Sequence, residues 1–275
     1  MLLNLKEILE IAEKGCFAIP AFNVYNMETV IGVMQAAEEL KAPVILQGYS
    51  RLFQNDDAYY LSPVILNAAK KSSLPICFHL DHGSEMLQII RGIRYGCTGI
   101  MIDGSKLPLE ENISLTKQVV DVCTAASIPV EGELGHIGTT NEIDSLKHTD
   151  VNEAKQFVQE TGVSALAVMV GTAHGRYKKA PKLDIGIIEE IHKKTSASLV
   201  LHGGSGVPDE EIKAAINAGI RKINFGTDVC YSFLDKVFET SRDIVAIDLF
   251  MKDAVDGVKD FALEKIRLLG AENKA

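Results

Sequence analysis

Short apolar runs alternate with longer amphipathic segments along most of the chain. The runs are almost continuously hydrophobic, as parallel strands buried on both faces are, and the segments between them repeat apolar residues at the helical period. We predict strands at residues 17–22, 43–47, 75–79, 99–102, 128–131, 165–170, 198–202 and 222–225. We predict helices between them that include residues 27–40, 85–95, 110–127, 152–161, 183–194 and 209–218.

Strands that alternate with helices indicate the α/β class and a parallel sheet. Eight such units in about 250 residues predict a closed (β/α)8, or TIM, barrel. An open doubly wound sheet is the alternative, but no GxGxxG motif follows the first run. Residues 2–14 predict an extra helix before the barrel, and residues 229–268 predict one or two long helices after it, which we expect in oligomer contacts. No linker-like stretch interrupts the pattern, so residues 1–275 are expected to form a single domain.

Composition narrows the possible functions. The chain is 47% hydrophobic and 24% charged, which is typical of a globular protein, and its net charge of −9 argues against nucleic acid as a partner. A small anionic substrate stays possible, because one local site can oppose the overall charge. The five cysteines are odd in number and lack CxxC spacing, and the first helix carries charges throughout. We therefore expect reduced thiols and a cytoplasmic protein with no signal peptide and no membrane contact.

Polar residues gather where the predicted strands end. In α/β barrels the catalytic groups lie at the carboxyl ends of the strands, so these residues are expected to converge on one mouth. The polar residues concerned are Asn23, His79, Asp81, His82, Asp103, Ser105, Glu131, Glu133, Thr172, His174, His202, Ser205, Asn224, Thr227 and Asp228.

Three histidines stand out within this group. His82, His174 and His202 each precede a glycine at the end of a different predicted strand. A single histidine is usually a surface or core residue, but three at equivalent positions favour a metal site. Three neutral imidazoles leave an open coordination position, as a catalytic zinc ion requires, and zinc could polarise a substrate carbonyl. Of the remaining four, we interpret His79 as a core residue or a supporting group for a ligand. We interpret the other three as structural or solvent-exposed: His136, His148 and His192.

Carboxylates accompany the proposed ligands. Asp81 directly precedes His82 and is placed for proton transfer near a metal-bound carbonyl, although it could instead orient a histidine. Asp103 and Glu133 could form an outer pair that either supports the ligands or provides an alternative metal position, since hard oxygen ligands suit such a site.

Glycine-rich turns follow the last two predicted strands. The turn after the seventh contains Gly203, Gly204 and Ser205, and the turn after the eighth contains Gly226 and Thr227. Loops at these two positions are the frequent phosphate site of α/β barrels, and glycine lets the backbone approach the anion. A phosphorylated substrate is therefore expected.

Together these residues resemble the class II ketose-bisphosphate aldolases, which act on fructose and tagatose 1,6-bisphosphate. The resemblance extends from Ala21 to about Leu269. It rests on the motifs HLDHG at 79–83, MIDGS at 101–105, EGELG at 131–135, VGTAHG at 170–175, LHGGSG at 201–206 and NFGTD at 224–228.

The resemblance implies a role for each matching position. His82, His174 and His202 would bind catalytic zinc, and Asp81 would be the proton donor and acceptor. It further implies a second or alternative metal at Asp103 and Glu133, a dihydroxyacetone-phosphate site with a nearby Na⁺ or K⁺ ion, and a homodimer or homotetramer. The implied phosphate-site residues are Gly175, Gly203, Ser205, Asn224 and Thr227. The implied reaction is a reversible cleavage between C3 and C4, in which Asn224 helps to hold the enediolate oxygen and no lysine Schiff base is needed.

The chain departs from the family pattern at three places. Asn141 stands at the position where the family has a glutamate on a mobile loop. We therefore expect the neighbouring Glu142 to take the role of that glutamate in proton transfer. A C-terminal arginine that reaches the far phosphate, often from a neighbouring subunit, is replaced by Asp248 or Leu249. After the second strand, Ser50 matches a serine near that phosphate, and Arg51 could supply the missing positive charge; otherwise the aldehyde half carries no phosphate.

Four functions are therefore compared. The first is an aldolase for fructose or tagatose 1,6-bisphosphate. The second is an aldolase for another ketose 1-phosphate or a keto-deoxy sugar acid phosphate. The third is a non-catalytic aldolase-like subunit, which the presence of all three histidines disfavours. The fourth is a zinc hydrolase on the same barrel, which does not explain the phosphate site.

Overall fold

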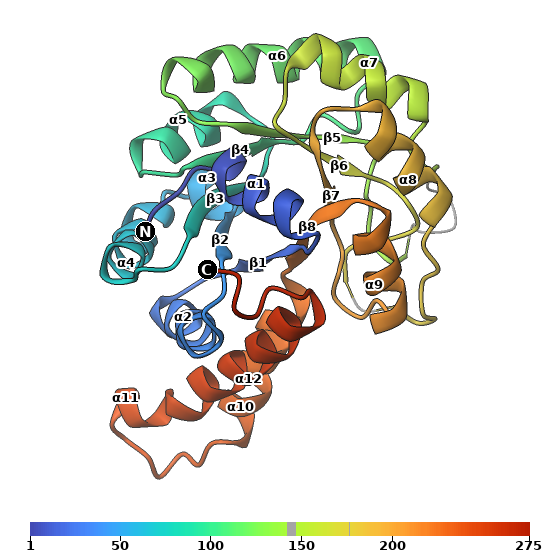
Figure 1. Ribbon diagram of the computed structural model, residues 1–275. Helices are drawn as coiled ribbons and strands as arrows, with labels where there is room; N and C mark the ends of the chain where they lie inside the picture. Colours follow the sequence, from blue (N-terminus) through green and yellow to red (C-terminus); the bar gives the residue numbers. More distant parts are fainter. Residues whose placement is uncertain (142–146, 176) are drawn as a thin grey trace.

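Eight parallel strands close into a barrel in the computed structural model, which describes residues 1–141, 147–175 and 177–275. Each strand pairs with the next along the chain, and β8 pairs with β1, so the expected TIM barrel is confirmed (Figure 1). The strands are β1 Ile19–Asn23, β2 Val44–Tyr49, β3 Ile76–Gly83, β4 Gly99–Ile102, β5 Val130–Leu134, β6 Ala165–Val168, β7 Ser198–Leu201 and β8 Ile220–Phe225.

Helices follow the strands and surround the barrel (Figure 1). They are α1 Leu5–Gly15, α2 Met27–Leu40, α3 Ser50–Gln54, α4 Ala58–Lys71, α5 Met86–Arg94, α6 Leu109–Ala125, α7 Val151–Thr161, α8 Ile185–Lys194, α9 Asp209–Ala218, α10 Thr227–Glu239, α11 Ile247–Phe250 and α12 Lys252–Leu268. The hydrophobic pattern did not single out α3 and α4. In α4, Pro63 lies inside the helix and Tyr59 and Tyr60 are exposed, so its apolar stripe is weak.

Strand β3 is longer than predicted and carries a local irregularity. It runs on to Gly83 instead of ending at residue 79, and its register against β4 shifts between Leu80 and Gly83. His82 lies in this shift with a φ of +52°, which is the left-handed region that β-strand residues avoid. The irregularity re-aims the strand end where the predicted metal ligand lies, as bulges near active sites do.

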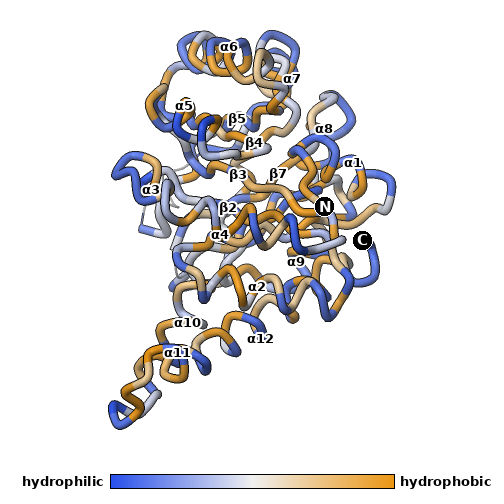
Figure 2. Tube along the Cα trace, turned by 90° about the vertical axis from the view of Figure 1, so that its left-hand side faces the viewer, coloured by the Kyte–Doolittle hydropathy of each residue, from blue (hydrophilic) through white to orange (hydrophobic). Residues whose placement is uncertain are grey.

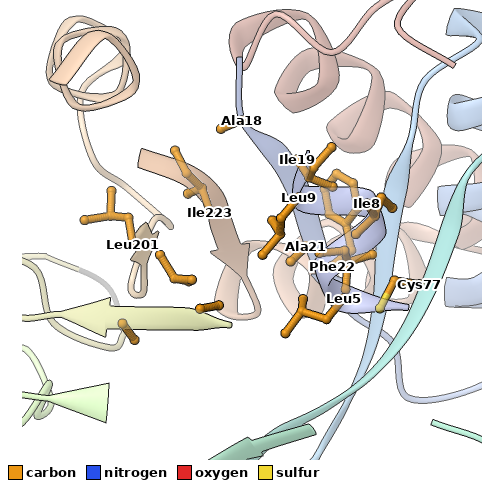
Figure 3. Packing of buried hydrophobic residues seen from close by; sticks show 14 of the residues in the cluster. Leu5, Ile8, Leu9, Ala18, Ile19, Ala21, Phe22, Cys77, Leu201 and Ile223 are labelled. Atoms are coloured by element: carbon orange, nitrogen blue, oxygen red, sulfur yellow. The ribbon is translucent and has the colours of Figure 1, made fainter. Parts of the chain in front are cut away.

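The extra helix expected before the barrel is α1, and it closes the amino-terminal end of the barrel. Its N-terminus is held by a capping box between Asn4 and Glu7, and the Leu5 N–H donates to the Thr98 carbonyl oxygen just before β4. Figure 3 shows Leu5 and Ile8 near the first strand, and both side chains are fully buried. With one end filled by apolar side chains, the polar strand ends identified above lie at the opposite end.

The C-terminal helices extend away from the barrel as an arm (Figure 1). One or two long helices were expected after the eighth strand, and the structure has two, α10 and α12, with the short α11 between them. Helix α12 packs against α2 and α10. Figure 2 shows hydrophobic residues, in orange, along α10 and α11 of the arm. Several large apolar side chains within residues 234–249 are exposed. These are Leu234, Phe238, Ile244, Val245, Ile247 and Leu249. No helix in the described parts of the chain is both long and apolar enough to cross a membrane.

Candidate functional site

A cavity of about 460 Å³ opens at the carboxyl ends of the barrel strands. Every strand or the loop after it contributes to its lining, so the predicted convergence of the strand ends is observed. The contributors, from β1 to β8 in order, include Asn23, Tyr49, Asp81, Asp103, His136, His174, Gly203 and Asn224.

The three predicted zinc ligands meet at this cavity. The ring centroids of His82 and His202 are 4.6 Å apart, and those of His82 and His174 are 4.9 Å apart. One nitrogen from each of the three rings lies within 4.8 Å of the other two. The Nδ1 atom of His202 and the Nε2 atom of His82 are only 2.9 Å apart. The three strands therefore bring together a donor set of the size that a zinc ion needs.

The second nitrogen of each ring has an acceptor. His82 Nδ1 lies 3.0 Å from Oδ2 of Asp103, and His202 Nε2 lies 2.8 Å from Oε1 of Glu131. His174 Nδ1 lies 3.0 Å from the carbonyl oxygen of Ile137. An acceptor on one nitrogen places the proton there and leaves the other nitrogen bare, which is how histidine ligands of metals are usually oriented. This arrangement fits a divalent cation held by His82 Nε2, His202 Nδ1 and His174 Nε2.

A second group of possible ligands shares His82. His82, Asp103 and Glu133 also offer one atom each within 4.8 Å of one another. The Oε1 atom of Glu133 accepts a hydrogen bond from the Ile137 N–H, but its buried Oε2 accepts none within the described residues. A buried carboxylate oxygen without a donor is unfavourable unless a cation neutralises it, so this group fits the predicted alternative metal position.

Asp81 is held by two amides. Asn23 Nδ2 donates to its Oδ2 at 2.8 Å, and Asn224 Nδ2 donates to its Oδ1 at 3.2 Å. Gln47 Nε2 in turn donates to Asn23 Oδ1 at 2.9 Å. Hydrogen-bond donors on both oxygens stabilise the charged carboxylate in a position where it is only 3% exposed. Asp81 therefore contacts amides and not a histidine ring, which disfavours the alternative that it orients a ligand.

The metal-free site has strongly perturbed acid–base properties. Burial would lower the pKa of His82, but the charge of Asp81, the hydrogen bond to Asp103 and the charge of Glu133 raise it to about 10. Burial and the neighbouring His82 and His202 lower the pKa of His174 to about 3. Burial and the charge of Asp103 raise the pKa of Glu133 to about 8. Such clustered shifts are typical of functional sites.

The pKa of Asp81 is lowered, in contrast to that of the buried carboxyl group of Glu133. Burial alone would raise it, but the charges of His82, His202 and Lys222, with the hydrogen bond from Asn23, outweigh burial and lower it. Asp81 is therefore an anion at neutral pH, and it is able to accept a proton from a bound hydroxyl group.

The glycine-rich turns after β7 and β8 also line the cavity. Gly203 has a φ of +63°, and a Cβ atom at this position would lie 2.4 Å from the Ala173 carbonyl oxygen, so no other residue fits without a backbone shift. Ser205 and Thr227 line the cavity, and Thr227 begins α10. A helix N-terminus beside close-approaching glycines is a favourable environment for an anion.

Most of the predicted phosphate residues line the cavity, but two do not. Gly175, Gly203, Ser205, Gly226 and Thr227 line it, as do Ser50 at the start of α3 and Asn224 on β8. Gly204 instead packs against Ile223, where a Cβ atom would lie 2.6 Å from Cγ2. Arg51 is exposed, and its guanidinium group lies over the Tyr49 ring at 5.6 Å from the centroid. It is not among the lining residues, and its expected role toward the far phosphate stays a prediction.

Three further expectations have different outcomes. His136 was interpreted as structural or solvent-exposed, but it lines the cavity and its Nδ1 atom lies 3.2 Å from Ser105 Oγ. Asp248 and Leu249 lie on α11 of the arm and are not among the lining residues. Glu142 falls within residues 142–146, which lie outside the described parts of the chain, so its role stays a prediction.

Sequence reasoning placed Glu131 among the polar strand ends without a role of its own, and it did not include Lys222 or Tyr177, which also support the site. Glu131 and Lys222 form a fully buried ion pair behind His202, with 2.9 Å between Lys222 Nζ and Glu131 Oε2. The Tyr177 hydroxyl accepts from the Ala173 N–H at 2.8 Å and lies 3.0 Å from the Gly203 carbonyl oxygen, which joins the loops after β6 and β7. The pairs Lys222/Asn224 and Glu131/Glu133 were detectable, because polar residues spaced by two share one face of a strand.

Comparison with known proteins agrees with this geometry. Residues 3–274 match the family described as fructose-bisphosphate aldolase class-II. The uncharacterized protein YdjI of Escherichia coli (strain K12) is 38% identical over 263 residues, which are 94% of each chain. The crystal structure of the YdjI aldolase from Escherichia coli K12 superimposes with a TM-score of 0.91 at 36% identity over both whole chains.

Two further crystal structures extend the comparison. A provisional fructose-1,6-bisphosphate aldolase from Coccidioides immitis has a TM-score of 0.91 at 27% identity, over 98% of this chain and 97% of that chain. The fructose-bisphosphate aldolase of Campylobacter jejuni, at 23% identity and a TM-score of 0.85, shares the fold over 100% of this chain and 97% of its own. The chain belongs to the class II fructose-bisphosphate aldolase family.

Proposed function

We propose that this chain is a metal-dependent aldolase that reversibly cleaves a ketose 1-phosphate between C3 and C4 into dihydroxyacetone phosphate and an aldehyde. The observation that carries the proposal is the shared cavity, where three histidine nitrogens, the Asp81 carboxylate and the glycine-rich turns after β7 and β8 meet. Fructose and tagatose 1,6-bisphosphate are the first candidate substrates, because the family to which the chain belongs is named for such a substrate.

His82, His174 and His202 would hold the catalytic cation, with Zn²⁺ as the expected ion because imidazole nitrogens suit it. His82, Asp103 and Glu133 would hold a second or alternative ion. When bound, the catalytic cation supplies a Lewis acid that polarises the substrate carbonyl and stabilises the negative charge that develops as the carbon–carbon bond breaks.

Asp81 would accept the proton of the C4 hydroxyl group during cleavage and return it during condensation. The amides of Asn23 and Asn224 hold both of its oxygens, so the base is oriented before the substrate arrives. Asn224 Oδ1 is buried and accepts no hydrogen bond from the described residues, which leaves it available for a substrate hydroxyl. Glu142 would serve the second proton transfer, at the carbon of the enediolate.

The phosphate of the dihydroxyacetone half would lie against Gly175, Gly203, Ser205, Gly226 and Thr227. Backbone N–H groups of glycine-rich turns and the N-terminus of α10 favour an anion there, even though the whole chain carries a net charge of −9. This placement directs the other half of the substrate toward the side of the cavity lined by Tyr25, Tyr49, Ser50, Lys106 and His136.

A second candidate is an aldolase for a ketose 1-phosphate, or a keto-deoxy sugar acid phosphate, whose aldehyde product carries no phosphate. The position of Arg51 favours it, because this guanidinium group lies over Tyr49 and not in the cavity. Condensation of dihydroxyacetone phosphate with a panel of aldehydes separates the two candidates. A strict requirement for glyceraldehyde 3-phosphate contradicts the second, and equal turnover of unphosphorylated aldehydes contradicts the first.

The assay itself tests whether the chain is an enzyme. Zinc-loaded protein is expected to consume dihydroxyacetone phosphate and an aldehyde, chelator-treated protein is expected to lose this activity, and added zinc is expected to restore it. Full activity after chelation would contradict the metal mechanism. Stoichiometric zinc without turnover of any aldehyde would instead favour a non-catalytic subunit, and hydrolysis of a phosphate ester would favour a hydrolase.

We also propose that the chain forms a homodimer or homotetramer through the arm. Phe238 is 82% exposed and Val245 is 87% exposed, and they lie among further exposed apolar side chains in residues 234–249. Contiguous apolar surface of this kind is typical of protein–protein interfaces, because leaving it in water is unfavourable.

A further inference from the structure

Three strands bring a charged network into the interior of the barrel below the candidate metal ligands. Lys222 on β8, Glu131 on β5 and His79 on β3 are all 0% exposed. One oxygen of Glu131, Oε2, lies 2.9 Å from Lys222 Nζ and 3.3 Å from His79 Nε2. The other oxygen, Oε1, lies 2.8 Å from Nε2 of His202. The carboxylate therefore joins a buried lysine to one of the three histidines.

Stability does not account for this network. Removing two charges from water is costly, and a buried ion pair usually contributes no more than well-packed apolar residues of the same volume would. Ile220, two residues before Lys222 on the same face of β8, is fully buried, which shows that an apolar side chain fits this interior. The placement of the pair directly behind His202 points to a function at that ring.

Two opposing groups approach the same nitrogen of His202. Glu131 Oε1, an acceptor, lies 2.8 Å from Nε2, and Asn224 Nδ2, a donor, lies 3.2 Å from it. If His202 hydrogen-bonds to Glu131, the proton is on Nε2 and the bare Nδ1 faces His82. If it hydrogen-bonds to Asn224 instead, Nε2 is bare, and the proton on Nδ1 points into the position that a cation would take. The charge of Glu131 decides between these two tautomers.

We infer that Glu131, held in place by Lys222, is a positioning residue that fixes the tautomer and orientation of His202 and so presents Nδ1 to the bound cation. This inference rests on the metal centre of the proposed function. Lys222 keeps the carboxylate charged and in register, and the Nε2–H of His202 donates to it. Asn224 is then left to donate to Asp81 Oδ1, 3.2 Å from its Nδ2, so the same network also keeps the base oriented.

Nitrogen NMR of the ¹⁵N-histidine-labelled protein reads the tautomer directly. In the wild-type protein, metal-free and zinc-loaded, the signal of His202, assigned by its loss in His202→Gln, is expected to show the proton on Nε2. A proton on Nδ1 in the wild-type protein overturns the inference without any variant at Glu131.

The double variant Glu131→Gln with Lys222→Met tests the charge. It removes both buried charges together, so it leaves no unpaired ion and is expected to fold. Zinc affinity, measured by competition with a chromophoric chelator, is expected to fall roughly 10–100-fold, as for other groups that support metal-bound histidines. The His202 signal of the metal-free variant is expected to shift toward the Nδ1–H tautomer.

The Arg221–Glu13 pair provides the matched control. Arg221 lies next to Lys222 on β8, and its Nε is 2.9 Å from Glu13 Oε2 on α1 at the closed end of the barrel. Arg221→Met with Glu13→Gln is expected to leave zinc affinity and the His202 tautomer unchanged. Wild-type affinity and tautomer in the Glu131/Lys222 variant overturn the inference, whereas failure of the wild-type protein to bind zinc overturns the proposed metal centre.

Discussion

The Nδ1 atom of His202 lies 2.9 Å from the Nε2 atom of His82, and the two rings meet edge to face at 88°. The residues are 120 positions apart, so the barrel alone brings them together. At this distance the two nitrogens share a proton or a cation, since two bare lone pairs would repel. The raised pKa of His82, about 10, indicates that a proton takes this place in the metal-free protein. Metal binding therefore displaces a proton at this pair.

Replacement of His174 by alanine is expected to remove the third ligand and leave the His82–His202 pair in place. A two-histidine site holds zinc weakly, so we expect zinc affinity to fall by at least about 100-fold and aldolase activity to be lost with it. The measurement is bound zinc per chain after dialysis, together with turnover. His148→Ala is the control, because His148 is 3.4 Å from Asp184 and is absent from the cavity lining. Equal zinc content in the two variants would show that His174 is not a ligand.

Replacement of Asp81 by asparagine is expected to separate metal binding from proton transfer. The side chain keeps its size, and its one remaining oxygen can still accept from Asn23 or Asn224, but it is no longer a base. We expect kcat to fall about 10²–10⁴-fold, the range for loss of a general base, while zinc content stays that of the wild-type protein. An active Asp81→Asn protein would mean that another group transfers the proton.

Gly203→Ala is expected to disrupt the part of the cavity where the phosphate is proposed to bind. The left-handed backbone costs an alanine about 1–2 kcal/mol, and its Cβ atom would also meet the Ala173 carbonyl oxygen at 2.4 Å. We expect a loss of unfolding free energy above about 2 kcal/mol in urea titrations and a raised KM for phosphorylated substrates. Gly162→Ala isolates the backbone cost, because Gly162 has a φ of +71° with nothing within 4 Å of the added atom. Equal stability of the two variants would contradict the clash.

Tyr177→Phe is expected to loosen the connection between the loops after β6 and β7. The change leaves the buried Ala173 N–H without its acceptor, which costs about 1–3 kcal/mol in unfolding free energy. Because the same hydroxyl lies 3.0 Å from the Gly203 carbonyl oxygen, the KM for dihydroxyacetone phosphate is expected to rise as well. Tyr60→Phe, at a side chain 77% exposed, is expected to change stability by less than about 0.5 kcal/mol. A Tyr177→Phe protein that matches this control would refute the connection.

Charged residues on the arm are expected to reduce the oligomer to monomers. Phe238→Glu together with Val245→Glu places two charges in the most exposed apolar part of the arm, where burial against a second copy would be strongly disfavoured. Sedimentation velocity of the wild-type and variant proteins measures the change. Tyr60→Glu, an equally exposed apolar position on α4, should leave the mass unaltered. A monomeric wild-type protein would contradict the proposed interface.

The fold was predictable because the alternation of strands and helices is strong. All eight predicted strands overlap observed ones, and the predicted helices at Met27–Leu40 and Asp209–Ala218 have the observed bounds. Strand ends were less certain, and β3 shows why. Its continuation to Gly83 depends on a register shift against β4 and on the left-handed backbone of His82, which are set by tertiary contacts and not by local sequence.

The gathering of the candidate metal ligands was predictable for the same reason, since residues at strand ends must converge once the barrel closes. The placement of Arg51 was not, because its direction depends on the short helix α3 and on the Tyr49 ring over which it lies. His136 shows the converse case. It lies after the predicted strand end, and the loop that follows β5 brings it back over the cavity.

The two halves of the cavity differ in how their residues are tied together. On the metal side, His202, Glu131 and Lys222 are linked by successive hydrogen bonds, and Asn224 donates to Asp81, so a change at one of these residues disturbs its partner. On the aldehyde side, Ser50 begins α3 and Lys106 lies in the loop after β4, and neither has a hydrogen bond to those residues among the described contacts. In the proposed aldolase, the residues that carry out the reaction and those that select the aldehyde would therefore lie in separate parts of the cavity. Substitutions on the aldehyde side would then change which aldehyde is accepted during evolution without changing the residues that carry out the reaction.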